Sequence, residues 1–247
     1  MVIMYLIGVV WLTRRCYCYE NLSRRPSTTV TQSSTLKDRR AHLINDGDYS
    51  TVFWSCAHTG YNYSRAWAQV DLGESYRINS VKIYYRIEDE WKPKRFRHFY
   101  LDVSDLPVTQ TTTRERTRCY SDHTNYPDFP PNIIEIVCRY TARYVIVETI
   151  YDAPDDTHDG AILEICEIEV YGCSTTCASN ACDNSGVCTR GCKIGFVGSR
   201  CETPCHVKLQ ELQDSNSRYE YALAGVVLVL LIVLAYNGWL LRKKYCK

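Results

Sequence analysis

The sequence has almost no net charge, because 29 Lys and Arg residues nearly balance 28 Asp and Glu residues. This balance argues against a nucleic-acid-binding protein, whose affinity depends on basic residues that neutralise phosphates. The sequence also lacks common catalytic motifs, since it contains no HExxH, GxSxG, Walker A or GxGxxG pattern. Its six His residues are scattered along the chain. We therefore expect a binding protein that is not an enzyme and does not bind nucleic acid.

Cysteine, by contrast, is abundant. The chain contains 14 Cys, and seven of them lie between Cys173 and Cys205. So many thiols indicate an oxidising compartment in which disulfides form. The protein is therefore expected to enter the secretory pathway.

The N-terminus has the pattern of a signal peptide, predicted over residues 1–18. The apolar run Val2–Leu12 is too short to span a membrane but suits the core of a cleaved leader. Arg14 and Arg15 follow this run instead of preceding it, which is the reverse of the usual charge order. The alternative is therefore an unprocessed N-terminus that forms a buried strand.

Residues 221–241 form an uncharged run of 21 residues, which is long enough for a transmembrane helix. The basic sequence RKKYCK at 242–247 follows directly and predicts a cytoplasmic tail, with 206–220 as a juxtamembrane linker. The protein is then a single-pass type I protein of the plasma membrane with an extracellular N-terminal part. The sequons at Asn21 and Asn62 lie on that side and are predicted to be glycosylated.

Residues 173–205 are too few to form a stable hydrophobic core without crosslinks. The gap between Cys192 and Cys201 contains Gly-Phe-x-Gly and resembles the last loop of an EGF-like module, although the spacing is closer to multiple-EGF-like receptors. Six cysteines can form three disulfides in fifteen different connectivities. The resemblance implies one of these, with the pairs Cys173–Cys182, Cys177–Cys188 and Cys192–Cys201. Cys205 is left over and is a candidate for a disulfide-linked dimer. A zinc cluster is the competing interpretation, which the irregular spacing disfavours.

Residues 20–172 contain short strand-like runs separated by turn residues, without a long helical period. About 150 residues with irregular strand spacing favour an all-β sandwich or jelly roll. The clearest runs are Ser80–Tyr85, Phe99–Val103, Ile133–Val137, Tyr144–Ile150 and Ile162–Tyr171.

Several motifs within residues 20–172 carry a resemblance to a known family. They are Asn45–Asp48, Ser55–Gly60, Trp67–Gly73 and Cys166–Gly172. In this order they resemble discoidin-type (F5/8 type C) domains of the fucolectin and tachylectin branch. With the EGF-like module and the transmembrane helix, the chain is similar to mollusc cell-surface receptors. The resemblance implies a discoidin-like jelly-roll β-sandwich.

The same resemblance implies a structural calcium ion and a Cys56–Cys166 disulfide. Calcium prefers six to eight oxygen ligands. The matching positions are the carbonyls of Leu43, Asp48 and Cys166, the carboxylates of Asp46 and Glu167, and Ser55. The alternative is that Asp46-Gly47-Asp48 is only a turn. Cys119 and Cys138 then remain outside the stalk and are expected to pair.

The resemblance also implies a fucose site formed by His58, Arg86 and Arg95. Guanidinium and imidazole groups can donate hydrogen bonds to sugar hydroxyls in fixed geometry. The segment Ile87–Trp91 departs from the family, which has an adjacent cysteine pair there, and Trp91 is expected to supply the apolar platform instead. The competing interpretation is a solvated basic run at Lys92–Arg97.

Two neighbouring features bear on this site. A glycan at Asn62 is expected to obstruct it. The acidic run Tyr151–Asp159 is interpreted as an exposed polar loop in preference to a second ion site.

These features lead to three hypotheses. The first is a cell-surface lectin-like receptor for fucosylated glycans. The second is an adhesion or co-receptor ectodomain without sugar binding, which recognises a protein, an acidic polysaccharide or a lipid headgroup through the basic run. The third is a truncated relative of receptor phosphatases that acts as a decoy or partner.

Overall fold

The computed structural model describes residues 19–88, 90–183, 186–207 and 210. The predicted signal peptide at 1–18, the transmembrane helix at 221–241 and the tail at 242–247 lie outside these residues, as does most of the 206–220 linker. Among the residues that are described, no helix has the length and apolar character needed to cross a membrane.

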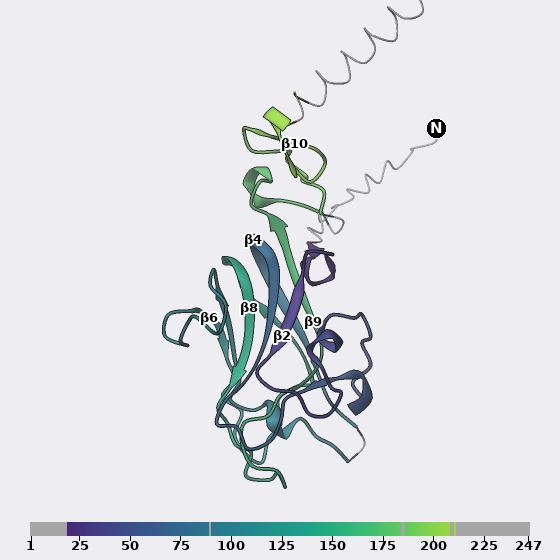
Figure 1. Ribbon diagram of the computed structural model, residues 1–247, viewed down its shortest axis with the longest axis vertical. Coiled ribbons are helices and arrows are strands. Elements are labelled where there is room, and N and C mark those ends of the chain that lie inside the picture. The colour runs from purple at the N-terminus through teal and green to yellow at the C-terminus, as the bar shows by residue number, and fades with distance from the viewer. Residues whose placement is uncertain (1–18, 89, 184–185, 208–209, 211–247) are drawn as a thin grey trace, which may run out of the picture.

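Residues 19–204, where described, fold into strands and short 3-10 helices (Figure 1). The strands are β1 (Glu20–Asn21), β2 (Thr29–Gln32), β3 (Ala57–His58), β4 (Ala66–Tyr85), β5 (Tyr100–Ser104), β6 (Thr117–Ser121), β7 (Ile133–Val137), β8 (Thr141–Thr149), β9 (Glu164–Ser174), β10 (Phe196–Val197) and β11 (Thr203–Pro204). The 3-10 helices are η1 (Leu22–Arg24), η2 (Ala41–Ile44), η3 (Phe53–Ser55), η4 (Lys94–Phe96) and η5 (Ala178–Asn180).

Strand β4 belongs to both layers of a sandwich. Its first part, Ala66–Asp71, pairs with β2 and β8, whereas Ile78–Tyr85 pairs with β9 and β7. A register shift separates the two parts, as expected where a strand passes from one sheet to the other. β8 continues to β5 and β6, and β9 continues to β1 and β3. The all-β sandwich expected from the sequence is confirmed.

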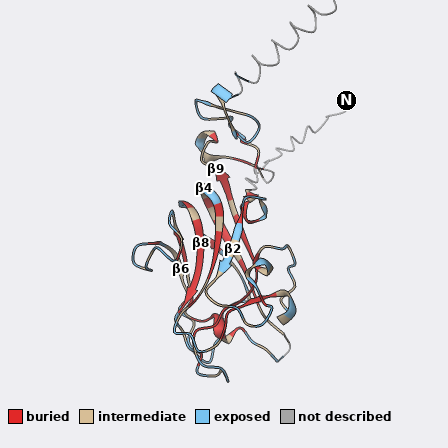
Figure 2. Ribbon diagram, in the orientation of Figure 1, coloured by how far each residue is buried: buried red, intermediate tan, exposed pale blue. Residues whose placement is uncertain are grey.

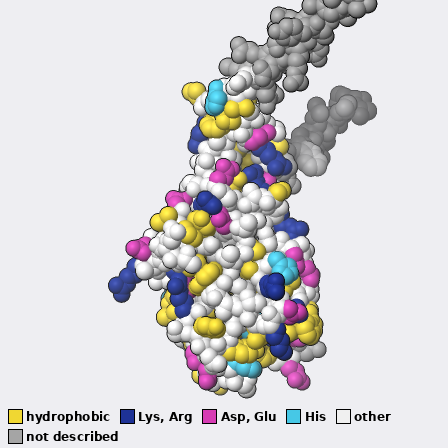
Figure 3. Space-filling model, viewed as in Figure 1, with side chains coloured by type: hydrophobic (Ala, Val, Ile, Leu, Met, Phe, Trp, Pro, Cys, Tyr) yellow, Lys and Arg dark blue, Asp and Glu magenta, His cyan; other side chains and the backbone are white. Residues whose placement is uncertain are grey.

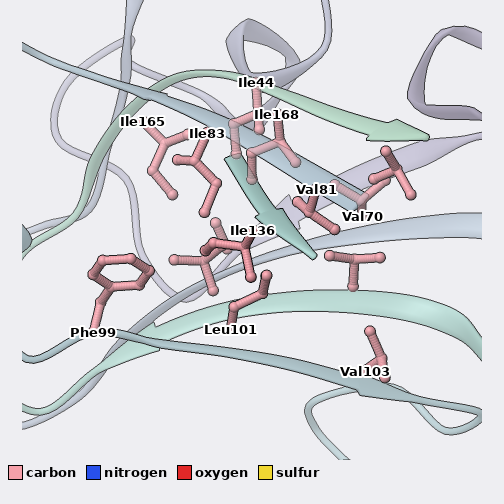
Figure 4. Close-up of a cluster of buried hydrophobic side chains, with 14 of the residues drawn as sticks. Ile44, Val70, Val81, Ile83, Phe99, Leu101, Val103, Ile136, Ile165 and Ile168 are labelled. Atoms are coloured by element: carbon pink, nitrogen blue, oxygen red, sulfur yellow. The ribbon is translucent and has the colours of Figure 1, made fainter. Parts of the chain in front are cut away.

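The core lies between these two layers. Ile83 and Ile168 from one layer face Leu101 and Val103 from the other (Figure 4), and all four are at most 2% exposed. Burying each such side chain contributes about 1.5–3 kcal/mol. Figure 2 shows the central strands largely buried and the connecting loops partly exposed. The five runs expected from the sequence fall in β4, β5, β7, β8 and β9.

Five disulfides crosslink the described chain, and they are the five pairs expected above: Cys56–Cys166, Cys119–Cys138, Cys173–Cys182, Cys177–Cys188 and Cys192–Cys201. Cys205 is free. The sulfurs of Cys177, Cys188 and Cys201 cluster within 4.8 Å. Because all three are in disulfides, they are not available as zinc thiolates.

The disulfide-rich segment packs against the sandwich. Glu20 accepts hydrogen bonds from Arg25 at 3.0 Å and from Arg200 of the segment at 3.4 Å. β9 leads into this segment at its C-terminal end, so Glu164 at its start lies at the opposite end of the sandwich (Figure 1). Ten residue steps at about 3.3 Å each separate the two ends by roughly 33 Å.

Candidate functional site

The three residues expected to bind sugar meet at the start of β9. His58 on β3 pairs directly with Glu164 in the antiparallel register. Arg86 follows β4, and its backbone N–H donates to the Glu164 carbonyl at 3.1 Å. Arg95 lies in η4. Strand pairing therefore places two of the three residues, and the loop after β4 brings in the third.

Their side chains converge on one carboxylate oxygen. Glu164 Oε1 lies 2.6 Å from Arg86 Nη1, 3.2 Å from His58 Nε2 and 3.3 Å from Arg95 Nη1. Trp91 Nε1 donates to the other oxygen, Oε2, at 3.2 Å. The Glu164 carboxylate therefore contacts all three expected binding residues and is the centre of the site. Its side chain is fully buried.

The environment of Glu164 favours its charged form. Burial by itself raises the pKa of a carboxyl group, but the hydrogen bond with His58 and the positive charges of Arg95 and Arg86 outweigh that effect. The pKa of Glu164 is therefore lowered below its ordinary value. The site contains a carboxylate at neutral pH.

The tautomer of His58 follows from its neighbours. Its Nδ1 lies 2.6 Å from the Thr59 carbonyl oxygen, which can only accept a hydrogen bond, so Nδ1 carries a proton. Nε2 lies 3.2 Å from Glu164 Oε1, which can only accept, and 3.2 Å from Arg95 Nη1, which can only donate.

The basic run is not a solvated face, in contrast to the competing interpretation. Arg95 and Arg97 are at most 3% exposed, and they form ion pairs with Asp156 and Asp155. Lys94 lies 3.7 Å from Asp156. The prediction of an exposed acidic loop was therefore wrong for Asp156, whose side chain is 1% exposed. Because these carboxylates pair with cations, they provide no support for a second ion site.

Aromatic rings surround the cationic groups. The Arg86 guanidinium lies 4.4 Å from the centre of the Trp91 ring and 4.6 Å from that of Phe53. Tyr61 stacks on His158 with 4.1 Å between ring centres, and its ring centre lies 5.7 Å from the Arg95 guanidinium. A polar centre with aromatic walls is suited to a pyranose, which has both hydroxyl groups and apolar faces.

The expected calcium ligands come from segments that also meet. Gly47 N–H, between Asp46 and Asp48, donates to Glu167 Oε2 at 3.1 Å. The Asp48 carboxylate accepts hydrogen bonds from the Ser55 side chain and from the Ser50 N–H. Both hydrogen bonds lower the pKa of Asp48. The Cys56–Cys166 disulfide joins the residue that follows Ser55 to the residue that precedes Glu167, so it holds these two expected ligands close to each other. Leu43 lies in η2, three residues before Asp46.

Glu167 has an unusual environment that fits a cation. Its Oε1 is buried and has no hydrogen-bond partner. Burial raises the pKa of Glu167 to about 7; the Gly47 N–H and Arg24 oppose this increase, and Asp46 and Glu169 add to it. A buried carboxylate oxygen without a donor is a suitable ligand for calcium. The residues present therefore fit the ion.

The two sequon asparagines differ in structure. Asn21 Nδ2 donates to Glu169 at 3.2 Å, while its Oδ1 accepts from Ser23, which is fully buried. Asn62 is exposed in the loop next to Tyr61. Only Asn62 therefore leaves its side chain accessible beside the candidate sugar site.

Sequence reasoning missed Glu164, Tyr61 and Asp156. Glu164 had a detectable signal, since it is a charged residue inside the apolar run that precedes Cys166. Tyr61 had none, and Asp156 was interpreted only as part of an exposed acidic loop, because the roles of both depend on how loops distant in sequence meet.

Residues 43–147 match a protein family described as NedA-like, galactose-binding domain, of the F5/8 type C group. This range includes His58, Arg86 and Arg95 but ends before Glu164. No curated protein sequence matches the chain.

Solved structures of lectins are also similar to the chain. A fucolectin from striped bass (Morone saxatilis) serum is 28% identical with a TM-score of 0.48, covering 62% of this chain and 47% of that chain. The lectin domain of lectinolysin complexed with Lewis b antigen is 26% identical, with a TM-score of 0.48 and coverage of 62% and 96%. A fucose-binding module from Streptococcus pneumoniae is 23% identical, with a TM-score of 0.47 and coverage of 62% and 95%. The chain thus spans less than half the length of the fucolectin chain.

Proposed function

We propose that this protein binds fucosylated glycans through His58, Arg86 and Arg95. The observation that carries the proposal is the convergence of these three side chains on Glu164 between aromatic rings. Guanidinium groups donate to ring and hydroxyl oxygens, and the buried Glu164 carboxylate holds them in a fixed orientation. Trp91 provides an apolar surface for the methyl group of a deoxy sugar. The match of residues 43–147 to a galactose-binding domain supports a carbohydrate ligand.

A calcium ion would be held by Leu43, Asp46, Asp48, Ser55, Cys166 and Glu167. Its chemistry would be structural, because it supplies positive charge to the buried carboxylate of Glu167. The ligand segment 43–48 would then be fixed against η3, which contains Phe53. The calcium site would thereby hold one wall of the sugar site in place.

The protein would act as a single-pass cell-surface receptor without enzymatic activity. Its disulfides suit an extracellular environment, and residues 221–241 have the length and composition of a membrane anchor. In this arrangement the sugar site would face away from the disulfide-rich segment that precedes the membrane. Free Cys205 is available for a disulfide-linked dimer.

The alternative of polyanion recognition has less support. Arg95 and Arg97 of the basic run are buried and paired with carboxylates. On the face shown in Figure 3, basic and acidic side chains are interspersed and do not form one basic area. We therefore favour a sugar ligand over heparin or a lipid headgroup.

The test is binding of fluorescent fucosylated and non-fucosylated glycans to cells that display the full-length protein. Binding should be inhibited by free L-fucose, reduced by a calcium chelator, and lost in His58→Ala and Arg86→Ala. Lys92→Ala, an exposed change in the same basic run, serves as the matched control and should bind normally. Absence of fucose-inhibitable binding, or normal binding by both site variants, would overturn the proposal.

A further inference from the structure

The two arginines of the candidate sugar site are both paired with carboxylates. Arg86 and Arg95 supply two cationic groups, whereas Glu164 lies between them and Asp156 pairs with Arg95 from the other side. Glu88 also accepts from Arg86 Nε at 2.8 Å. Two closely placed arginines usually form a receptor for sulfate, phosphate or carboxylate. Here that positive charge is already neutralised.

We propose that Glu164 determines the charge class of the bound sugar, so that the site accepts an uncharged pyranose and rejects rings that carry a sulfate or carboxylate. This inference rests on the proposed sugar site. It assigns Glu164 a role in specificity beyond holding the three binding side chains in place.

Electrostatic repulsion would oppose the binding of an anionic group at this site. An anionic group that accepted hydrogen bonds from Arg86 and Arg95 would share those donors with Glu164 Oε1, which lies 2.6 Å and 3.3 Å from them. Two negative charges would then lie within a few ångströms of each other in a buried site, where water screens their repulsion poorly. The Glu164 carboxylate has no solvent-exposed position to move to, since its side chain is 0% exposed.

The direction of the available hydrogen bonds also favours hydroxyl groups over oxyanions. A sugar hydroxyl can accept from a guanidinium and donate to a carboxylate at the same time, whereas sulfate and carboxylate only accept. Glu88 accepts from Arg86 Nε at 2.8 Å, and its side chain is 36% exposed, so a ligand hydroxyl can donate to this carboxylate beside the guanidinium. The mixed set of donors and acceptors therefore matches hydroxyl groups better than oxyanions.

The test compares methyl α-L-fucoside with sulfated methyl fucosides as competitors for binding by the full-length protein. Wild type should prefer the uncharged fucoside by at least about tenfold, a typical result of unfavourable charge pairing in a buried site. Glu164→Gln, which retains the shape but removes the charge, should reduce this ratio by about tenfold. Glu90→Gln removes an exposed charge in the neighbouring loop and should leave the ratio unchanged.

Different outcomes would overturn the role of Glu164 and the proposed sugar binding. Equal or tighter wild-type binding of the sulfated fucosides overturns the role of Glu164 but leaves sugar binding intact. A Glu164→Gln variant that weakens both competitors equally has the same consequence. If Glu164→Gln does not fold, a fucoside with an uncharged methanesulfonyl group at the sulfated hydroxyl decides the inference: wild type should bind it better than the sulfated fucoside, and equal exclusion of both would show a steric cause and overturn the role of Glu164. Absence of binding to every fucoside overturns the proposed function itself and this inference with it.

Discussion

The backbone N–H of Gly47 donates to Glu167 Oε2 at 3.1 Å, which joins residues 120 positions apart in sequence. Gly47 has φ of +82°, and its Cα faces the Arg24 guanidinium so closely that a Cβ would lie 2.3 Å from Nη1. A side chain at this position would therefore disturb both contacts. The loop 45–48 and strand β9 thus meet at the carboxylate that is the main candidate for binding calcium.

Arg24 places a competing positive charge at this position. Its Nη1 lies 3.9 Å from Glu167 Oε1, the oxygen that has no hydrogen-bond partner. We expect Arg24→Gln to raise calcium affinity by about three- to tenfold, a modest effect because the Arg24 side chain is partly exposed and screened. Titration calorimetry with calcium measures the change. Arg40→Gln, at an exposed position, is the charge-matched control, and an unchanged or lower affinity in Arg24→Gln would contradict the assignment.

Calcium should also stabilise the folded protein through Glu167. At a calcium concentration about one hundred times the dissociation constant, a ligand that binds only the folded state adds about 2.7 kcal/mol to the free energy of unfolding. Thermal unfolding with calcium and with a chelator should therefore differ by several degrees in wild type. Glu167→Gln should abolish most of the difference. A similar increase in that variant would place the ion elsewhere.

The sequence was sufficient for the parts of the fold that depend on local pattern. β7 was expected at Ile133–Val137 and is found there, because a short run rich in β-branched residues favours a strand. β4 was expected only over its last six residues. The part before Ser80 contains Gly73 and three charged residues, so its strand structure depends on pairing with β2 and β8 more than on local pattern.

The same distinction applies to the candidate site. His58, Arg86 and Arg95 were identified by resemblance, and the structure brings them to one point. The central role of Glu164 depends on the register between β3 and β9, which no local pattern specifies. The pairing of Arg95 with Asp156 joins residues 61 positions apart. A charge run that looks solvated in sequence is therefore buried where a distant loop supplies the opposite charge.

Asp156 should make the free energy of unfolding depend on pH in the acidic range. Burial alone would raise its pKa, but hydrogen bonding to Arg95, the charge of Arg95, the Thr157 N–H and Lys94 lower it below its ordinary value of 3.8. A carboxyl group whose pKa is lower in the folded state stabilises that state above the unfolded pKa, and this contribution is lost as pH falls through the folded pKa.

Asp156→Asn should therefore be less stable than wild type at neutral pH, by about 1.5–3 kcal/mol, since Arg95 loses one charged partner but keeps Glu164. The difference should shrink as pH is lowered below about 4, where wild type loses the same ion pair. Denaturant unfolding at a series of pH values measures it. Asp159→Asn, an exposed change in the same loop, should follow wild type throughout. A difference that stays constant with pH would show that the charge of Asp156 is not responsible.

Substitution of the two sequon asparagines should have different effects on glycan binding. Asn62 is exposed beside Tyr61, so a glycan there would stand at the edge of the sugar site, and Asn62→Gln should increase glycan binding by about two- to fivefold through removal of steric obstruction. Asn21→Gln should not increase binding. Its Nδ2 contact with Glu169 would be disturbed, which should reduce stability by about 1–2 kcal/mol. Mass spectrometry of wild type establishes which position carries a glycan, and cell-surface binding of fluorescent glycans measures the effect. If wild type carries a glycan at Asn62 and Asn62→Gln still binds like wild type, the glycan does not obstruct the site.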